Sequence, residues 1–209
     1  MPILLDIDSS PLAETSISRQ LTAEFVRSWK LATATGKVIT RDLAITSIPP
    51  VTGAWVGAAY TPEDSRTPDQ RNLLTLSDSL IAELQAADEY VLGVPMHNFS
   101  VPSTLKLWID QVARVNKTFS YATGTPVGLL TGKKATIMIA SGGKYDAGTA
   151  MASFNFVEPY LRTVFGFLGV TDTTFITAGG AAALNYGRID RQTFLQPHLE
   201  SIHAQFQPA

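Results

Sequence analysis

Hydrophobic and polar residues follow two different periodicities along the chain. Five short segments are either continuously apolar or alternate apolar with polar residues, which is the pattern of buried and half-buried strands. These segments begin at Ile3, Lys37, Glu89, Lys134 and Thr173. Between and after them apolar residues recur every three or four positions, as in Leu21, Phe25 and Trp29, and this spacing predicts helices. The helical segments begin at Ile17, Arg71, Ser103, Phe154 and Arg188.

The order of these elements predicts the fold class. Strands that alternate with helices form βαβ units, which build a parallel sheet with helices on both faces. We therefore predict an α/β chain that forms a single domain over residues 1–209, with a doubly wound five-stranded parallel sheet in the flavodoxin-like order 2-1-3-4-5. This order reverses between strands 1 and 3, and ligands bind outside the carboxyl ends of the strands at such a point. Residues 44–70 are expected to form a functional loop or to contain a short helix.

Composition narrows the class of protein. The chain has 209 residues, of which 45% are hydrophobic and 16% charged, as in ordinary globular proteins. Its net charge of -2 and the lack of a basic run argue against nucleic acid or an anionic membrane surface as a partner. Because there is no cysteine, disulfides and thiolate metal sites are excluded. The N-terminus lacks the basic region of a signal peptide and no apolar run is long enough to span a bilayer, so we expect a soluble, cytoplasmic protein.

The loop after the first strand is rich in hydroxyl groups. This serine loop, residues 9–18, has the sequence SSPLAETSIS and leads directly into the first helix. The first residues of a helix present unpaired N–H groups and a partial positive charge, which suits a phosphate group. Each serine taken alone is better explained as a helix N-cap, because Ser and Thr are preferred at that position. The whole cluster, at the point where the strand order reverses, favours a phosphate site.

Two common phosphate-binding motifs are missing. No G-x-G-x-x-G follows a strand, which argues against a dinucleotide fingerprint. The segment VGLLTGKK resembles a P-loop, but Val127 replaces its first glycine and Lys134 replaces its serine or threonine. A monophosphate held by hydroxyl and amide groups fits the sequence better.

The loops after the third and fourth strands supply groups that suit a flat heterocycle. The third strand ends on Met96-His97-Asn98-Phe99, where an amide side chain stands beside two apolar ones. After the fourth strand, Gly142 and Gly143 let the backbone approach a flat ligand closely. Plainer alternatives remain for both loops, namely core packing for Met96 and Phe99 and a simple turn for the glycines. Together with the serine loop, these segments predict a crevice for flavin mononucleotide (FMN).

The same segments resemble a known family. VPMHNFSVPSTLKLWIDQVARVNKTFSY, followed by GLLTGKKATIMIASGG, is similar to the FMN-dependent NADH-azoreductases, flavodoxin-like homodimers that also reduce quinones. The serine loop and PYLRTVFGFLGV match the family at the same spacing, so the resemblance covers nearly the whole chain. It implies that the cofactor-binding residues are Ser10, Ser16, Ile17, Ser18, Met96, His97, Asn98, Phe99, Ala140, Ser141, Gly142 and Gly143.

Within that set the resemblance assigns a part of the cofactor to each loop. The serines and Ile17 would hold the ribityl phosphate, residues 96–99 would contact the isoalloxazine ring, and residues 140–143 would line its other edge. Two segments depart from the family, which usually has tyrosine where His97 stands and Ser-Arg where Ala140-Ser141 stands. Backbone contacts should survive both changes, whereas contacts of the family's tyrosine and arginine with substrate or nicotinamide are not carried over.

The activity implied is the reduction of azo compounds and quinones with NADH or NADPH as electron donor. A flavin carries the redox chemistry itself, so no catalytic amino acid is expected. Turnover is expected to be ping-pong, with two electrons passing from the nicotinamide to the flavin and then to the acceptor. Phe119 and Tyr121 are candidates for stacking the substrate, although such an aromatic pair is more often part of a core or interface. The resemblance also implies a homodimer with the flavin near its interface.

Two other functions remain open at this stage. A strand that ends Asp6-x-Asp8-x-Ser10 is close to the signature of haloacid-dehalogenase-type phosphohydrolases, which use Mg²⁺, but the acidic pair expected after a later strand is missing. More plainly, Asp6 and Asp8 are solvated or capping groups. The other alternative is a non-enzymatic electron carrier like flavodoxin. Such carriers are usually strongly acidic, so a net charge of -2 argues against it.

Overall fold

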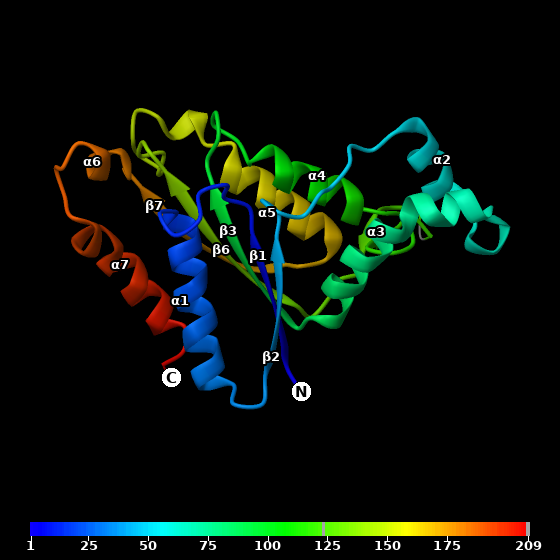
Figure 1. The fold of residues 1–209 in the computed structure, drawn as a ribbon, viewed down its shortest axis with the longest axis horizontal. Helices are drawn as coiled ribbons and strands as arrows, with labels where there is room; N and C mark the ends of the chain where they lie inside the picture. Colours follow the sequence, from blue (N-terminus) through cyan, green and yellow to red (C-terminus); the bar gives the residue numbers. More distant parts are fainter. Residues whose placement is uncertain (123, 208–209) are drawn as a thin grey trace.

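The core of the chain is a five-stranded parallel sheet (Figure 1). The computed structural model describes residues 1–122 and 124–207, so the predicted domain of residues 1–209 includes positions 123, 208 and 209 that lie outside the description. The strands lie in the order β2-β1-β3-β6-β7, and each neighbouring pair is parallel. Their bounds are β1 Ile3–Asp8, β2 Lys37–Asp42, β3 Glu89–Pro95, β6 Lys134–Ser141 and β7 Asp172–Gly179. The predicted α/β class and strand order are confirmed.

Helices cover both faces of this sheet, as Figure 1 shows. One face packs against α1 (Ile17–Ala32) and α7 (Arg191–Ala204), and the other packs against α3 (Pro68–Ala86), α4 (Ser103–Val112) and α5 (Val157–Leu168). Side chains on a strand point alternately to the two faces. Leu4 of β1 therefore joins the α1 core, whereas Leu5 and Ile7 join the core under α3, α4 and α5.

The long connection after β2 contains a short helix, as expected. It forms α2 (Gly53–Tyr60) and a 3-10 turn, η1 (Glu63–Ser65), before α3 begins. Trp55 of α2 is buried against Leu74 of α3. Thr67 and Gln70 form a capping box at the start of α3, with proline at its first position. The connection is thus an ordered part of the fold rather than an open loop.

A small second sheet lies at the other end of the molecule from the loops that follow the strands. It consists of β4 (Phe119–Ser120) and β5 (Val127–Gly128), which pair antiparallel. The N–H of Leu130 donates to the carbonyl of Leu168 at 2.9 Å, so this hairpin packs on the carboxyl end of α5, near the start of β7. Two further short helices, η2 (Ala152–Phe154) and α6 (Ala182–Asn185), follow β6 and β7. None of the described helices is long and apolar enough to cross a membrane.

Candidate functional site

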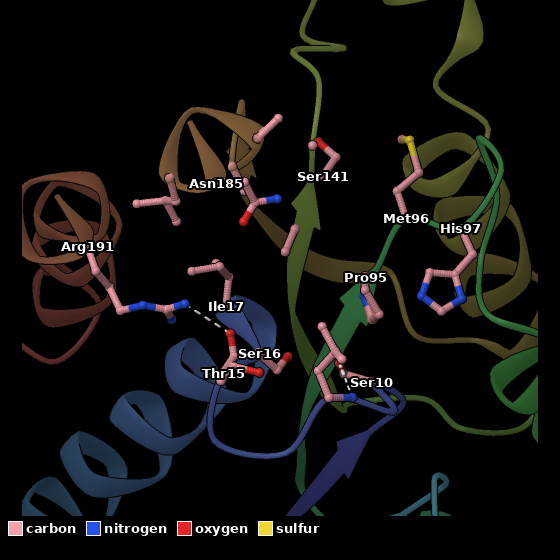
Figure 2. Close-up of a pocket in the computed structure, with 16 residues that line it drawn as sticks. Ser10, Thr15, Ser16, Ile17, Pro95, Met96, His97, Ser141, Asn185 and Arg191 are labelled. Carbon is pink, nitrogen blue, oxygen red and sulfur yellow. Dashed lines mark hydrogen bonds between the residues drawn. The ribbon is translucent and has the colours of Figure 1, made fainter. Parts of the chain in front are cut away.

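A crevice of about 300 Å³ opens at the carboxyl ends of β3 and β6, next to the loop that follows β1 (Figure 2). This is the edge of the sheet at which the strand order reverses, in agreement with the sequence-based expectation. Residues from all three predicted loops meet there. Of the predicted cofactor residues, those that line the crevice are Ser10, Ser16, Ile17, Met96, His97, Ala140, Ser141 and Gly142.

The serine loop and the first turn of α1 form a wall rich in hydrogen-bond donors. Ser16 is the N-cap of α1, and its Oγ accepts from the N–H of Arg19 at 3.3 Å. The N–H groups of Ile17 and Ser18 have no acceptor among the residues described. Ser18 itself is fully buried and does not line the crevice, although its Oγ lies 3.2 Å from the Oγ of Ser16. Free amides and hydroxyls at a helix start form a surface that can bind an anion.

Arg19 holds the serine loop in place through hydrogen bonds to its backbone. Its guanidinium donates to the carbonyl of Ser10 from Nε at 3.0 Å and from Nη2 at 2.8 Å. The same group bonds Asp42 at 2.6 Å and lies 3.4 Å from Asp8. The hydrogen bond from Arg19 lowers the pKa of the Asp42 carboxyl. Arg19 is thus committed to two carboxylates and does not line the crevice.

The two aspartates of β1, Asp6 and Asp8, are buried and do not line the crevice. Asp6 and Asp8 are 8% and 9% exposed. Thr22 donates to Asp8 at 3.0 Å, and burial together with the charges of Asp8 and Asp42 raises the pKa of Asp6 to about 7. No group of three or more His, Cys, Asp or Glu in the described part of the chain could hold a metal ion. The arrangement does not favour the phosphohydrolase alternative.

The second wall is formed by residues 95–97 at the end of β3, which lead into a tight turn at residues 97–100. The N–H of His97 donates to the carbonyl of Ser100 at 2.9 Å, and the N–H of Ser100 donates back at 3.0 Å. The two central residues, Asn98 and Phe99, have φ values of 48° and 72°, in the left-handed region that non-glycine residues avoid. Neither lines the crevice. The Phe99 ring instead packs edge-on against Tyr145, with ring centres 6.1 Å apart.

The third wall is the loop after β6, which is tied to the segment after β7. Gly180, Ala181 and Ala182 donate their N–H groups to the carbonyls of Gly143, Ser141 and Gly142, at 2.9, 3.0 and 3.1 Å respectively. Gly142 lines the crevice, whereas Gly143 does not and lies under the Tyr145 ring, which a Cβ would approach to 3.1 Å. These backbone bonds bring α6 to the crevice.

Several lining residues were not predicted from the sequence. They come mainly from α6 and the start of α7 and comprise Leu12, Pro95, Ala181, Ala182, Leu184, Asn185 and Arg191. Thr15, which also lines the crevice, belongs to the predicted hydroxyl cluster of the serine loop. Pro95 directly precedes the predicted residue Met96, so its position in the loop could have suggested it. Arg191 lies far along the chain, and no motif marks it as a neighbour of the serine loop. Only the packing of α7 beside α1 reveals this proximity.

The structure does not bring the predicted substrate residues Phe119 and Tyr121 to the crevice of their own chain. They lie on the β4 hairpin, which packs at the amino end of the parallel strands. Phe119 is buried, with its ring 4.7 Å from that of Phe167, and Tyr121 is 52% exposed. The hairpin follows α4, which runs away from the carboxyl edge of the sheet, and this explains its position.

Comparison with known proteins identifies relatives over almost the full length of the chain. A family model described as "Flavodoxin-like fold" matches residues 3–206. A protein of Acidobacterium capsulatum named FMN-dependent NADH:quinone oxidoreductase is 55% identical over 97% of this chain and 98% of its own length. FMN-dependent NADH:quinone oxidoreductase 3 of Burkholderia lata is 46% identical over the same shares of the two chains.

Solved structures show the same fold. An FMN-dependent NADH-azoreductase of Bacillus anthracis in complex with FMN superposes with a TM-score of 0.85 at 24% identity, over 98% of this chain and 97% of the other. Another azoreductase structure from Bacillus anthracis gives a TM-score of 0.87 at 24% identity, over 99% of both chains. These structures support the fold, and the family model and the sequence relatives confirm the family predicted from the sequence: the chain belongs to the FMN-dependent NADH:quinone oxidoreductases of the flavodoxin-like fold.

Proposed function

We propose that this chain binds FMN in the crevice and uses NADH or NADPH to reduce quinones and azo compounds. The observation that carries the proposal is the combination, in one crevice, of a helix start with free N–H donors and a lining of the apolar residues Pro95, Met96 and Ala140. Relatives that match nearly the whole chain are named FMN-dependent NADH:quinone oxidoreductases, which supports the same assignment.

The donor groups of the crevice fit a phosphate. The free N–H groups of Ile17 and Ser18 and the hydroxyls of Ser10 and Ser16 converge at one end. No carboxylate is present among the described lining residues to repel an anion. Ser10, Ser16, Ile17 and Ser18 would therefore hold the phosphate of FMN, Ser18 through its backbone because its side chain is buried.

The remaining walls fit a flat ring. Pro95, Met96 and Ala140 supply apolar surface, and Gly142 leaves its wall open, since the nearest atom that a Cβ would meet is 3.8 Å away. Ser141 is the polar side chain of this wall, but its Oγ donates to the carbonyl of Gly143 at 2.8 Å. Polar contacts to the ring edge are therefore expected mainly from backbone groups of residues 96–99 and 140–143.

The chain's own contribution to the reaction is binding and orientation. FMN, when bound, supplies two-electron chemistry between a nicotinamide and an acceptor. In the net reaction NADH and a proton reduce a quinone to a hydroquinone, and two NADH with two protons cleave the nitrogen–nitrogen bond of an azo compound to give two amines and two NAD⁺. The described lining residues include no carboxylate, cysteine or lysine, and their expected role is to bind and orient the reactants. Donor and acceptor are expected to occupy the same place in turn, which gives ping-pong kinetics.

A second copy of the chain is expected to cover the apolar surface beside the crevice. Phe99, Phe154 and Phe156 are 39%, 42% and 57% exposed. They are contiguous, because the rings of Phe99 and Phe154 lie 5.3 Å apart and the N–H of Phe156 donates to the carbonyl of Phe99. Exposed apolar patches of this kind mark interfaces. We infer a cytoplasmic homodimer with the flavin near its interface, which light scattering of the purified protein would test.

The deciding experiment is an absorption spectrum of the purified protein with excess FMN, recorded before and after NADH is added without oxygen. Bands near roughly 375 and 450 nm that bleach with NADH and return with a quinone or an azo dye are expected. Bound flavin that NADH does not bleach would favour an electron carrier. Failure of the protein to bind FMN would overturn the proposal.

A further inference from the structure

Arg191, on the first turn of α7, reaches the phosphate end of the crevice from the last helix of the fold. Figure 2 shows its side chain extended towards Thr15 and Ser16 of the serine loop. We propose that Arg191 recognises the phosphate of the flavin and so makes the crevice selective for FMN over riboflavin. This inference rests on the proposed function, because it requires that a flavin bind there.

The guanidinium is anchored by neutral groups only. Its Nη1 donates to Oε1 of Gln20 at 2.9 Å, and its Nη2 donates to the carbonyl of Thr15 at 3.1 Å. Gln20 is fixed in turn, since its Nε2 donates to the carbonyl of Glu14 at 2.7 Å. Two of the five N–H donors of the arginine are thus used to aim the group. The other three have no acceptor in the described part of the chain.

No negative charge neutralises Arg191. The neighbouring carboxylate, Asp190, is occupied as the N-cap of α7, where it accepts from the N–H of Thr193 at 2.9 Å and from its hydroxyl at 2.5 Å. Among the described residues, none of the ion pairs involves Arg191. Arg19, in the first turn of α1, is by contrast bound to two carboxylates.

Arg191 is also the single Lys, Arg, Asp or Glu side chain among the described residues that line the crevice. It stands beside the hydroxyls and free amides that would hold the phosphate. A guanidinium binds phosphate oxygens with charge-assisted hydrogen bonds, which are stronger than those from neutral donors. Riboflavin has the same ring and ribityl chain but no phosphate, so it gains nothing from this cation.

The test measures dissociation constants for FMN and for riboflavin by quenching of flavin fluorescence, in the wild-type protein and in Arg191→Gln. We expect FMN to bind about tenfold or more weakly in the variant, and riboflavin to change by less than about threefold. Arg191→Lys should fall between the two for FMN, because lysine keeps the charge but loses the planar fork. The matched control is Arg188→Gln, which removes a nearby arginine that stacks on Tyr186 and does not line the crevice. This control should change neither constant.

The outcomes separate the alternatives. Equal losses of FMN and riboflavin would show that Arg191 only braces the serine loop and would overturn the inference. The inference is also overturned if neither dissociation constant changes in Arg191→Gln, because their ratio then keeps its wild-type value. If Arg191→Gln does not fold, the ratio in Arg191→Lys decides, and a wild-type ratio there refutes selectivity by this side chain. If the wild-type protein binds FMN and oxidises NADH but the variants show no change in selectivity, the proposed function stands and only the inference about Arg191 is overturned. If the wild-type protein binds no FMN, both the proposed function and the inference are overturned.

Discussion

Replacing Asp6 by asparagine should stabilise the folded protein at neutral and alkaline pH and change it much less in acid. Asp6 is 8% exposed on β1, and burial together with the negative charges of Asp8 and Asp42 raises its pKa from 3.8 to about 7. Its Oδ1 has no hydrogen-bond partner among the described residues. Asparagine has a similar shape and no charge to bury, so Asp6→Asn removes the cause of this penalty.

The direction follows from the linkage between folding and proton binding. In strong acid the carboxyl is protonated in both the folded and the unfolded chain, so it contributes no penalty. As the pH rises, the unfolded chain loses the proton first, and the free energy of unfolding falls until the folded form also ionises near pH 7. A rise of the pKa from 3.8 to about 7 corresponds to about 4 kcal/mol in full. About 2.5 kcal/mol of this decrease in the free energy of unfolding occurs between about pH 5 and about pH 8.

Urea unfolding of the flavin-free protein, followed by tryptophan fluorescence across that pH range, measures the effect. Flavin must be removed because a ligand that binds the folded state adds its own stabilisation. The advantage of Asp6→Asn over the wild type should grow by about 2.5 kcal/mol from the acid to the alkaline end. Asp64→Asn, at an exposed acid of η1, is the control and should stay within about 0.5 kcal/mol of the wild type throughout. A constant offset between Asp6→Asn and the wild type at every pH would refute the reasoning.

Three further substitutions test the fold and the crevice separately. Gly142→Ala should keep its melting temperature, because an added Cβ meets no protein atom closer than the Cβ of Ala182 at 3.8 Å. It should weaken FMN binding in a flavin titration, because the methyl group is added to a residue that lines the crevice. Gly128→Ala should destabilise by about 2 kcal/mol or more in urea, since its Cβ would lie 2.1 Å from the backbone nitrogen of Gly169; a loss below about 0.5 kcal/mol would contradict this. Arg114→Ala should cost about 3 kcal/mol, because this guanidinium is 1% exposed and bonded to two side chains of α3; a wild-type melting curve would exclude that role.

Much of the fold could be predicted because buried strands and amphipathic helices leave long periodic patterns. The pattern fails where elements are short: β4 and β5 have two residues each, which is too few for any periodicity. It also fails at boundaries. Leu73 stands in helical spacing with Leu76 and Leu80, which predicts that it faces the core, but the structure buries Leu74 and leaves Leu73 45% exposed. The helix begins earlier than expected, at Pro68, through a capping box that the pattern of apolar residues does not reveal.

Strand order and loop sequence predicted only the part of the site that the three loops form. The three loops at the carboxyl edge meet as expected, because parallel strands end at a common edge. Asn98 and Phe99 were assigned to the crevice on their chemistry, yet the turn at residues 97–100 directs Phe99 towards Tyr145. Contributions from α6 and α7 were missed because they depend on backbone bonds between the loops after β6 and β7. Phe119 stands on a hairpin whose direction no local pattern specifies.

The turn at residues 97–100 also bears on the speed of ligand entry. Asn98 and Phe99 hold positive φ values within the chain itself, and the turn is closed by a reciprocal pair of backbone hydrogen bonds. A loop that must become ordered around its ligand adds a slow step to association and lowers affinity. In this chain the two backbone hydrogen bonds of the turn and the aromatic neighbours of Phe99 already hold the unfavourable backbone conformation. Stopped-flow mixing with flavin should therefore give one exponential phase whose rate rises linearly with flavin concentration, without a plateau set by rearrangement of this turn.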